Sequence, residues 1–250
     1  MNLSIIKKLS RDLRSIAEKV FEGKNISPEE GIILYKEGKL GFLGMLADHV
    51  RSTKNKNYAF FNRNLHIEPT NLCVFDCKFC SYSRLLKQKS DVGSWEMNDV
   101  QMLEMVKNHN QHITEVHIVG GVHPKMDLYY FANLLKQIKS FRPDLHIKAF
   151  TAVELEYMFR KAKVSYAEGL MILQEHGLDS IPGGGAEIFD DEIRKQICED
   201  KCTTEQWLEI HETAHNLGIH SNATMLYGHI ESFEHRIDHM NRLRQLQDKT

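Results

Sequence analysis

The stretch Leu65–Arg84 reads Leu-His-Ile-Glu-Pro-Thr-Asn-Leu-Cys-Val-Phe-Asp-Cys-Lys-Phe-Cys-Ser-Tyr-Ser-Arg. It places Cys73, Cys77 and Cys80 in the spacing C-x3-C-x2-C, directly after a short apolar segment. Three thiolates on one loop can hold a soft metal centre, and a [4Fe–4S] cluster with three cysteine ligands keeps one iron open. An open coordination position is typical of a catalytic metal site rather than a structural one. The spacing therefore predicts an iron–sulfur centre that takes part in chemistry.

The overall composition narrows the class of protein. The chain has 250 residues, a formal net charge of −2 and five cysteines. So small a charge does not favour a nucleic-acid partner, and no run of about 18 apolar residues predicts a membrane span. The N-terminal residues lack the pattern of a signal peptide. Because clustered cysteines in a cysteine-poor chain favour metal binding in a reducing compartment, we expect a cytoplasmic protein without nucleic-acid or membrane partners.

The first 60 residues differ in pattern from the rest of the chain. They show helical periodicity and no strand pattern. Ser27-Pro28-Glu29-Glu30 predicts a helix start, with a capping serine, proline at the first helical position and acids in the first turn. We interpret residues 1–60 as a helical extension that packs on a main domain of residues 61–250.

From residue 61 onward, predicted strands and helices alternate. The strands are expected at 65–68, 115–119, 146–150, 178–181 and 219–225, and the helices at 98–110, 127–141, 165–176, 204–217 and 231–248. Such alternation predicts right-handed βαβ units and a parallel sheet. Five units do not close a barrel. We therefore expect an α/β partial (β/α) TIM-like barrel that lacks its C-terminal strand or strands.

The predicted strands carry polar residues at every second position. Strands buried on both faces should be almost wholly apolar. A polar set that alternates with an apolar set instead indicates a barrel around a polar cavity, with the apolar set facing the helices. The polar positions are His66, Glu68, His117, Lys148, Asn222 and Thr224.

The cysteine spacing, with the aromatic Phe79 before the third cysteine, resembles the signature of the radical S-adenosylmethionine (SAM) superfamily. The resemblance implies a partial TIM barrel and a [4Fe–4S] cluster on Cys73, Cys77 and Cys80, with Phe79 beside SAM. In that family the open iron binds the amino and carboxylate groups of SAM. One-electron reduction, by a donor such as flavodoxin or ferredoxin, then gives methionine and a 5′-deoxyadenosyl radical. The alternative is a zinc or structural site, but zinc needs a fourth ligand and usually shows paired C-x2-C units.

Two further segments follow predicted strands, where barrel active sites lie. Glycines at Gly120-Gly121 let the backbone approach a ligand, although a Gly-Gly turn is also an ordinary strand–helix loop. The resemblance implies that this pair receives the methionyl amino group of SAM. By position, Thr151 and Glu154 are candidates for contacts with the SAM ribose.

Lys148 lies on the inner face of the third predicted strand, where a charge is costly to bury without an anion. It can pair with Glu68 or another internal acid. It can equally bind a carboxylate of the substrate or of SAM. The sequence leaves both interpretations open.

His211-Glu-Thr-Ala-His215 matches the H-E-x-x-H motif of zinc proteases. In a chain rich in histidine, composition alone makes this match about thirtyfold more frequent than the cysteine spacing. The segment lies on a predicted helix whose apolar residues, such as Trp207 and Ala214, are typical of packing on a sheet. We therefore expect a packed helix and no protease. Cys198 and Cys202 lack nearby ligand partners and are interpreted as ordinary thiols.

Within the superfamily, longer runs resemble the aminofutalosine synthase group of the futalosine route to menaquinone. These runs are residues 66–73, 117–124, 146–154, 182–189 and 222–231. The resemblance implies a transferase that adds the 5′-deoxyadenosyl radical to 3-[(1-carboxyvinyl)oxy]benzoate and gives 6-amino-6-deoxyfutalosine, with SAM as co-substrate. The sister group that cyclises dehypoxanthine futalosine is the alternative enzyme. A non-catalytic cluster-binding module is the alternative from another class.

A substrate with two carboxylates suits a cavity with basic side chains. Lys148 is the first candidate, together with His66, His123 and Arg84. Glu187, in the Gly183-Gly184-Gly185 loop, and Glu231, past the fifth strand, are expected to bond hydroxyl groups of the substrate or ribose. The catalytic candidates are thus Lys148, Glu187 and Glu231.

Overall fold

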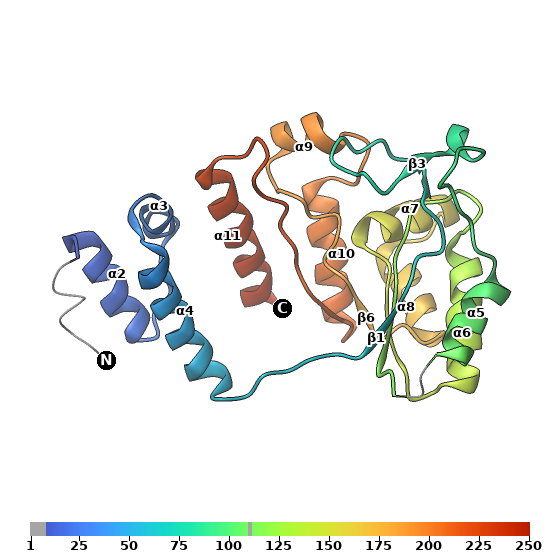
Figure 1. The fold of residues 1–250 in the computed structure, drawn as a ribbon, viewed down its shortest axis with the longest axis horizontal. Helices are drawn as coiled ribbons and strands as arrows, with labels where there is room; N and C mark the ends of the chain where they lie inside the picture. The colour runs from blue at the N-terminus through green and yellow to red at the C-terminus, as the bar shows by residue number, and fades with distance from the viewer. Residues whose placement is uncertain (1–8, 110–111) are drawn as a thin grey trace. The chain divides into compact units, whose positions relative to one another are not determined.

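The computed structural model describes residues 9–109 and 112–250, which form two compact units (Figure 1). One unit contains the residues up to Phe61 together with Glu231–Arg242, and the other contains Asn62–Ile230 together with Leu243–Thr250. The last helix, α11 (Phe233–Lys249), therefore contributes to both units. The sequence did not predict that residues 231–242 group with the N-terminal helices.

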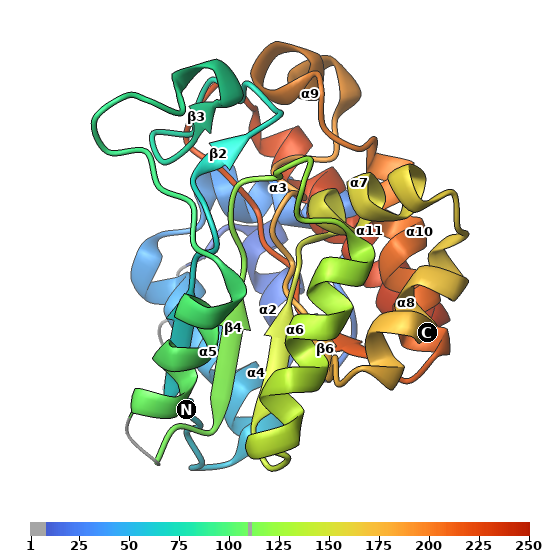
Figure 2. The same ribbon diagram turned by 90° about the vertical axis from the view of Figure 1, so that its right-hand side faces the viewer.

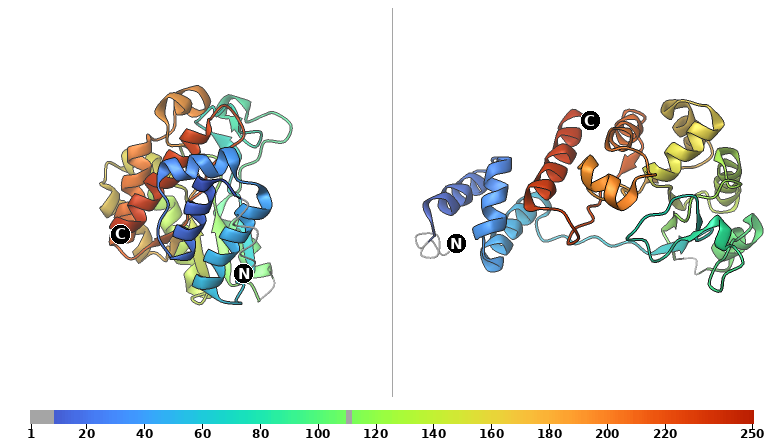
Figure 3. Two further views of the ribbon diagram at one scale, coloured as in Figure 1. Left: turned by 90° about the vertical axis from the view of Figure 1, so that its left-hand side faces the viewer. Right: turned by 90° about the horizontal axis from the view of Figure 1, so that it is seen from above.

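The smaller unit is helical, as the first 60 residues indicated (Figure 3, blue helices). It contains α2 (Arg11–Phe21), α3 (Pro28–Glu37) and α4 (Leu40–Asn55). The predicted start of α3 is confirmed by a capping box, in which Ser27 Oγ accepts from the Glu30 amide and the Glu30 carboxylate accepts from the Ser27 amide. The buried core of this bundle consists of Leu13, Ala17, Phe42 and Leu46.

The larger unit is built on a five-stranded sheet in which every paired neighbour is parallel. Across the sheet the order is β1 (Asn64–Ile67), β4 (Glu115–Ile118), β5 (His146–Ala149), β6 (Ser180–Ile181) and β7 (His220–Ser221). The strands follow this order along the chain and the sheet is not closed. The predicted α/β fold of partial TIM-like type is therefore confirmed.

Helices connect successive strands, and Figure 2 shows α5 (Asp99–Asn108) and α6 (Leu128–Phe141) in front of the sheet. The side chains of Val116, Ile118 and Ile147 are fully buried in one core with Leu134 and Leu135 of α6. The apolar set of the strands thus packs against helices, as the alternation predicted. The connecting helices are α5 (Asp99–Asn108), α6 (Leu128–Phe141), α7 (Ala152–Ala162), α8 (Tyr166–Glu175), α9 (Asp191–Cys198) and α10 (Thr204–Asn216).

Two details of the larger unit differ from the prediction. The segments α7 and α9 were not predicted as helices, although Thr151 and Glu154 form a capping box at the start of α7. Strand β7 is much shorter than the expected 219–225. Beyond Ser221, the Thr224 side chain still contacts the segment after β6, since its Oγ1 donates to the Gly183 carbonyl at 2.7 Å. In the described part of the chain, no helix is both long and apolar enough to cross a membrane.

Candidate active site

The cysteine loop is held between two short strands. The strands β2 (Leu72–Cys73) and β3 (Arg84–Leu85) pair in parallel and enclose residues 74–83, which carry Cys77 and Cys80. The pairing brings both ends of the loop together, so the three cysteines share one compact segment.

The loop backbone is also bonded to segments that are distant in sequence. The Val74 amide donates to the Val122 carbonyl at 3.0 Å, and the Lys78 amide donates to the Ile197 carbonyl at 3.0 Å. The loop is therefore fixed by the strand–helix connection after β4 and by the end of α9.

Thr70 and Asn71, just before the first cysteine, are polar residues in a buried position. The Asn71 amide nitrogen donates to the Gly93 carbonyl at 2.9 Å, and its oxygen accepts from the Trp95 amide at 3.0 Å. Thr70 Oγ1 donates to the Trp95 carbonyl at 2.7 Å. These bonds satisfy buried polar groups and fasten residues 93–95 to the loop. Sequence reasoning gave neither residue a role, although a Thr-Asn pair before the cysteines was visible.

Backbone amides point at two of the three sulfurs. Cys73 Sγ accepts from the amides of Phe75 and Val122, each at 3.4 Å, and Cys80 Sγ accepts from the Ser83 amide at 3.4 Å. Hydrogen bonds to cysteine sulfurs are one of the means by which proteins set the potential of iron–sulfur clusters. The amides at Cys73 favour its thiolate, but burial outweighs them and raises the pKa of this thiol.

The three cysteines line one cavity of about 300 Å³. No three His, Cys, Asp or Glu side chains in residues 9–109 and 112–250 are arranged to share a single metal ion. In a [4Fe–4S] cluster, however, each cysteine binds its own iron, so the thiols surround a volume and do not converge on a point. The donor set therefore fits a cluster with one open iron. We call this space the cysteine cavity; its lining also includes Glu68, Tyr82, Val119, Gly120, Gly121, Thr151, Glu154, Gly185 and Lys201.

Gly120 and Gly121 lie in the wall of the cysteine cavity, packed against the cysteine loop. A Cβ at Gly121 would be 2.3 Å from the Leu72 carbonyl oxygen, and one at Gly120 would be 2.9 Å from the Thr70 oxygen. The Gly121 amide donates to the Thr70 carbonyl at 2.7 Å. Glycine is thus required here by close backbone approach, whatever ligand binds.

Thr151 and Glu154 line the cavity and bond to each other. The Glu154 carboxylate accepts from the Thr151 amide and hydroxyl at 2.7 Å each and from the Gly120 amide at 3.1 Å. Burial raises the pKa of Glu154 to about 7, although these hydrogen bonds oppose the shift. One carboxylate therefore links the start of α7 to the glycine pair.

Lys201 brings a positive charge to the cavity, and sequence reasoning did not identify it. Its Nζ lies 2.7 Å from Glu187 Oε1, and both side chains are only 13% exposed. Nζ also lies 5.0 Å from the ring centroid of Phe79. Burial acts to lower the pKa of Lys201, but the charges of Glu187 and Cys77 outweigh it and raise the pKa. No motif marks Lys201, since it is far from the cysteines in sequence.

Burial raises the pKa of the Cys77 thiol to about 11, although the Lys201 charge opposes the shift. Phe79 itself is 38% exposed and does not contribute to the lining of the cavity. Its observed contact is with Lys201.

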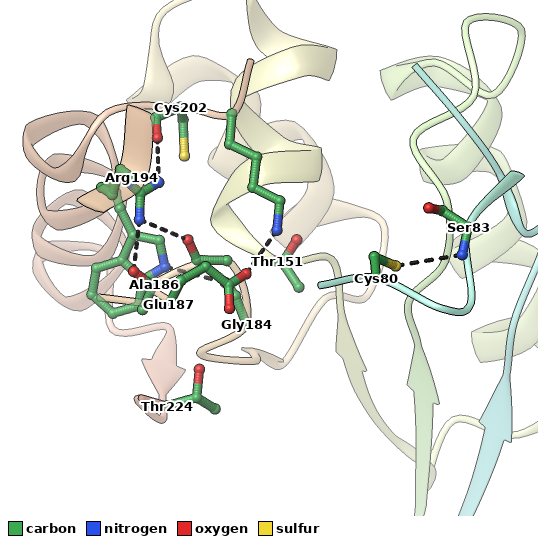
Figure 4. A network of polar contacts seen from close by, with 12 residues as sticks. Cys80, Ser83, Thr151, Gly184, Ala186, Glu187, Arg194, Cys202 and Thr224 are labelled. Atoms are coloured by element: carbon green, nitrogen blue, oxygen red, sulfur yellow. Dashed lines mark hydrogen bonds and ion pairs between the residues drawn. The ribbon is translucent and has the colours of Figure 1, made fainter. Parts of the chain in front are cut away.

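The glycine-rich loop after β6 is fastened by buried side chains (Figure 4). Arg194 donates to the Ala186 carbonyl at 2.7 Å and to the Cys202 carbonyl at 2.6 Å. Trp207 Nε1 donates to the Gly184 carbonyl at 3.2 Å. These bonds fix the backbone at Glu187, whose φ of 48° lies in the left-handed region. Glu187 is thereby held against Lys201.

The remaining residues expected around the substrate are dispersed. Lys148 Nζ lies 3.3 Å from Glu115 Oε2, so an internal acid is its partner in this structure. His123 is 5% exposed and lies near Glu96, with Nε2 3.8 Å from Oε1. Arg84 donates to the carbonyls of Ser81 and Ser83.

Glu231 belongs to the smaller unit, where its Oε1 accepts from Arg236 Nε at 2.7 Å. Within the larger unit, Lys148 and Glu187 have different partners, Glu115 and Lys201.

The histidines of the H-E-x-x-H segment lie on α10 and line a different pocket of about 550 Å³, here called the histidine pocket. His211 Nδ1 and His215 Nε2 both bond Ser221 Oγ, at 3.0 and 2.8 Å. Glu212 pairs with Lys249, with Nζ 2.6 Å from Oε1. The other lining residues include Trp207, Leu243, Leu246 and Thr250.

The His211 ring stacks on Trp207 with a centroid distance of 3.6 Å, and burial lowers the pKa of His211 to about 3. The apolar residues Trp207, Ile210 and Ala214 of α10 are buried in the main core. The segment is a packed helix, as expected.

Comparison with protein-family models matches residues 67–243 to the radical SAM superfamily. The chain belongs to the radical SAM superfamily. Members of this superfamily use a [4Fe–4S] cluster and SAM, which agrees with three cysteines around one cavity. Methylornithine synthase, a radical SAM enzyme of known structure, superposes with a TM-score of 0.71 at 18% identity over 92% of this chain and 64% of its own. At that identity the similarity shows the shared fold alone.

Sequence relatives in the superfamily carry more than one name. Aminodeoxyfutalosine synthase of Thermus thermophilus is 44% identical over 236 residues, which is 94% of this chain and 63% of that protein. The 5-amino-6-(D-ribitylamino)uracil–L-tyrosine 4-hydroxyphenyl transferase of Methanothermobacter thermautotrophicus is 38% identical over 83% of this chain and 56% of its own length. The chain thus spans less than two thirds of the length of these relatives.

Proposed function

We propose that this radical SAM enzyme joins the 5′-deoxyadenosyl group of SAM to 3-[(1-carboxyvinyl)oxy]benzoate and releases 6-amino-6-deoxyfutalosine. The observation that carries the proposal is the 44% identity to aminodeoxyfutalosine synthase across 94% of the chain, together with three cysteines around one cavity. When bound, the cluster and SAM supply the adenosyl radical that adds to the enol-ether double bond. Rearrangement and loss of the enolpyruvyl carboxyl group, which leaves with one water as bicarbonate, would then give the product. Because the adenosyl group stays in the product and methionine is released, SAM would be consumed as a co-substrate.

Cys73, Cys77 and Cys80 would hold the cluster. The amides of Phe75 and Val122 donate to Cys73 Sγ and would stabilise the negative charge of a thiolate there. Thr70 and Asn71 keep the loop in place through their buried hydrogen bonds. In this role the loop is a preformed frame with one iron position left open.

The glycine pair would accept the amino group of SAM through its carbonyl oxygens. Both glycine amides are already engaged, Gly120 with Glu154 and Gly121 with Thr70. An ammonium group needs acceptors, and carbonyl oxygens are the backbone groups left for it. Lys201, on the same cavity, would bind the carboxylate of SAM. Thr151 and Glu154 are proposed for the ribose.

Residues of the substrate end follow the same logic. Lys148 would exchange its contact with Glu115 for a substrate carboxylate. Glu187 and Glu231 are proposed to bind hydroxyl groups. In this structure Glu187 pairs with Lys201, and Glu231 accepts from Arg236. An electron donor such as flavodoxin or ferredoxin would deliver the reducing electron.

The test is product analysis after anaerobic reconstitution with iron and sulfide and reduction with dithionite. With SAM and 3-[(1-carboxyvinyl)oxy]benzoate, we expect a chromatographic peak of 6-amino-6-deoxyfutalosine that is absent for Cys77→Ala. Release of 5′-deoxyadenosine without that product would contradict the substrate assignment. Parallel incubations with other substrates would then test the alternatives. One contains dehypoxanthine futalosine, and the other contains tyrosine and 5-amino-6-(D-ribitylamino)uracil, the two compounds in the name of the Methanothermobacter relative.

A further inference from the structure

A row of polar side chains crosses the sheet at one level. His66 on β1 is in register with His117 on β4, and His117 is in register with Lys148 on β5. The row continues through Ser180 on β6 to His220 on β7. Because side chains alternate between the faces of a sheet, register partners in parallel strands share one face. All five strands therefore present a polar side chain to the same side.

This arrangement is unusual for a parallel sheet, whose faces are normally covered by apolar contacts. The neighbouring residues on the other face, Val116, Ile118 and Ile147, are fully buried in the main core. His66, by contrast, keeps 47% of its side chain exposed, and Lys148 keeps 22%. The polar face is thus not a core face, and it is suited to a polar ligand.

His117 carries an unused hydrogen-bonding atom in this row. Its Nε2 is buried and has no hydrogen-bond partner among the described residues. The ring stacks on His66, with a centroid distance of 4.9 Å and an interplanar angle of 25°. A buried polar atom without a partner costs free energy, and native proteins rarely retain one without a reason. A ligand that accepts a hydrogen bond would supply the missing partner.

Lys148 supplies a charge next to this atom. Its ammonium group has three donors, and Glu115 accepts from it at 3.3 Å. Glu115 is itself buried and also accepts from Asn62 Nδ2 at 3.2 Å. Burial, reinforced by the nearby His66 and Lys148, lowers the pKa of His117. A neutral imidazole carries one N–H, and the site argued below places it on Nε2.

Along the strands, the row lies two to three residues before the residues that line the cysteine cavity. Glu68 and Val119, which line the cavity, follow His66 and His117 by two residues, and Thr151 follows Lys148 by three. At the rise of a β-strand, the separation along the strands is about 7–10 Å. This span suits a benzene ring whose reactive enol ether points to the cavity and whose ring carboxylate points away from it.

We infer that His66, His117 and Lys148, here called the histidine–lysine row, bind the ring carboxylate of the substrate, the one that the product retains. His117 Nε2–H donates to one carboxylate oxygen, and the Lys148 ammonium pairs with the group in competition with Glu115. The stacked ring of His66 covers one face of the His117 ring. This inference rests on the proposed function, since it assigns a subsite to that substrate.

The experiment measures binding of 3-hydroxybenzoate to the reconstituted full chain by isothermal calorimetry, so that it does not depend on turnover. This probe has the ring carboxylate and lacks the enolpyruvyl group. Lys148→Met should raise its Kd about tenfold or more, the loss expected for a charge-assisted hydrogen bond. His117→Leu should raise the Kd about fivefold, whereas His117→Gln, which keeps an amide near Nε2, should retain most of the affinity.

Two variants separate recognition from a structural role. Glu115→Gln removes the competitor of the ligand and should tighten binding several-fold, the opposite sign from damage to the fold. His117→Leu should keep the Tm of the wild type, because it replaces an unsatisfied buried nitrogen with an apolar group. His176→Gln, at the C-cap of α8 and outside the row, is the matched control and should not change the Kd.

Several outcomes would overturn the inference: no binding of 3-hydroxybenzoate at millimolar concentration, equal binding of neutral 3-hydroxybenzamide, or an unchanged Kd in both Lys148→Met and His117→Leu. If the row binds the probe as expected but the wild type makes no 6-amino-6-deoxyfutalosine, the proposed reaction fails and the carboxylate site stands. If the product forms and the row variants bind normally, the reaction stands and the carboxylate site fails.

Discussion

The cysteine cavity and the histidine pocket lie in the same unit, and each is lined by residues at the spacing of a metal-binding motif. In the cysteine cavity, the loop is fixed by backbone hydrogen bonds, and the amides that reach the sulfurs would also stabilise thiolates. In the histidine pocket, His215 uses both ring nitrogens, on Ser221 and on Thr250. The comparison teaches that motif spacing alone does not indicate a metal site: His215 has no ring nitrogen left for a metal, although His211 Nε2 has no hydrogen-bond partner among the described residues.

The largest expected difference between the two cavities follows from removing one candidate metal ligand from each. Cys77→Ala should abolish cluster binding and SAM cleavage, because a [4Fe–4S] cluster held by two cysteines lacks a further iron ligand. His215→Ala should leave both unchanged. Iron and sulfide content, the EPR spectrum after reduction, and release of 5′-deoxyadenosine are the measurements. Loss of iron in His215→Ala would contradict the assignment of the metal site to the cysteine cavity.

Gly121→Ala should disrupt the wall of the cysteine cavity. The new Cβ would meet the Leu72 carbonyl at 2.3 Å, and neither backbone segment can move without displacing the cysteine loop. We expect a loss of about 3 kcal/mol in the free energy of unfolding, as for strained core substitutions, together with weak cluster binding. Urea unfolding measures the first effect. Gly44→Ala, on α4 with open space around it, is the control and should stabilise by about 0.5–1 kcal/mol.

The histidine pocket should make stability depend on pH. The pKa of His211 is about 3 in the folded chain, against 6.5 for an ordinary histidine. Between these values the unfolded chain binds more protons, so the free energy of unfolding falls as the pH falls. At pH 5 the loss should be about 2 kcal/mol relative to pH 7.5.

His211→Phe keeps a ring against Trp207 and removes the titrating group, so its stability should fall less between pH 7.5 and 5. Denaturant unfolding of both proteins at the two pH values gives the difference. Identical pH dependence in the two proteins would mean that His211 is not held neutral by burial.

The smallest effect is expected for Ser221→Ala. Its hydroxyl bonds both pocket histidines, and the loss should cost about 1 kcal/mol of stability. SAM cleavage should not change, in contrast to every substitution in the cysteine cavity. Ser140→Ala, which removes an exposed hydroxyl that bonds the Gln137 carbonyl, should be neutral in both assays. Altered SAM cleavage in Ser221→Ala would connect the two cavities functionally.

Local signals in the sequence predicted much of the fold. The serine cap and Glu168 located the start of α8, and strand alternation separated the core face from the polar face. The same T-x-x-E signal at Thr151 and Glu154 predicts α7, but it was interpreted only as a ligand site. Helix capping and ligand contact use the same residue types, so the pattern does not distinguish them.

The sequence could not predict which residues, far apart in the chain, lie next to each other in the folded protein. Lys148 and Glu115 lie on different strands, and only the register of the sheet brings them together. Lys201 reaches the cysteine cavity because Arg194 fixes the backbone around Glu187 and Cys202. No motif spacing encodes these positions, because each depends on tertiary packing.

The hydrogen bonds from the cysteine loop to Val122 and Ile197 have a consequence for the order of assembly. Contacts between residues far apart in sequence form late, because chain entropy must be lost before they contribute. During synthesis the cysteines emerge long before Ile197, so the nascent loop has no frame to hold a cluster. Cluster insertion should therefore follow folding of the sheet and α9, and the inserted cluster should then stabilise the folded chain by mass action.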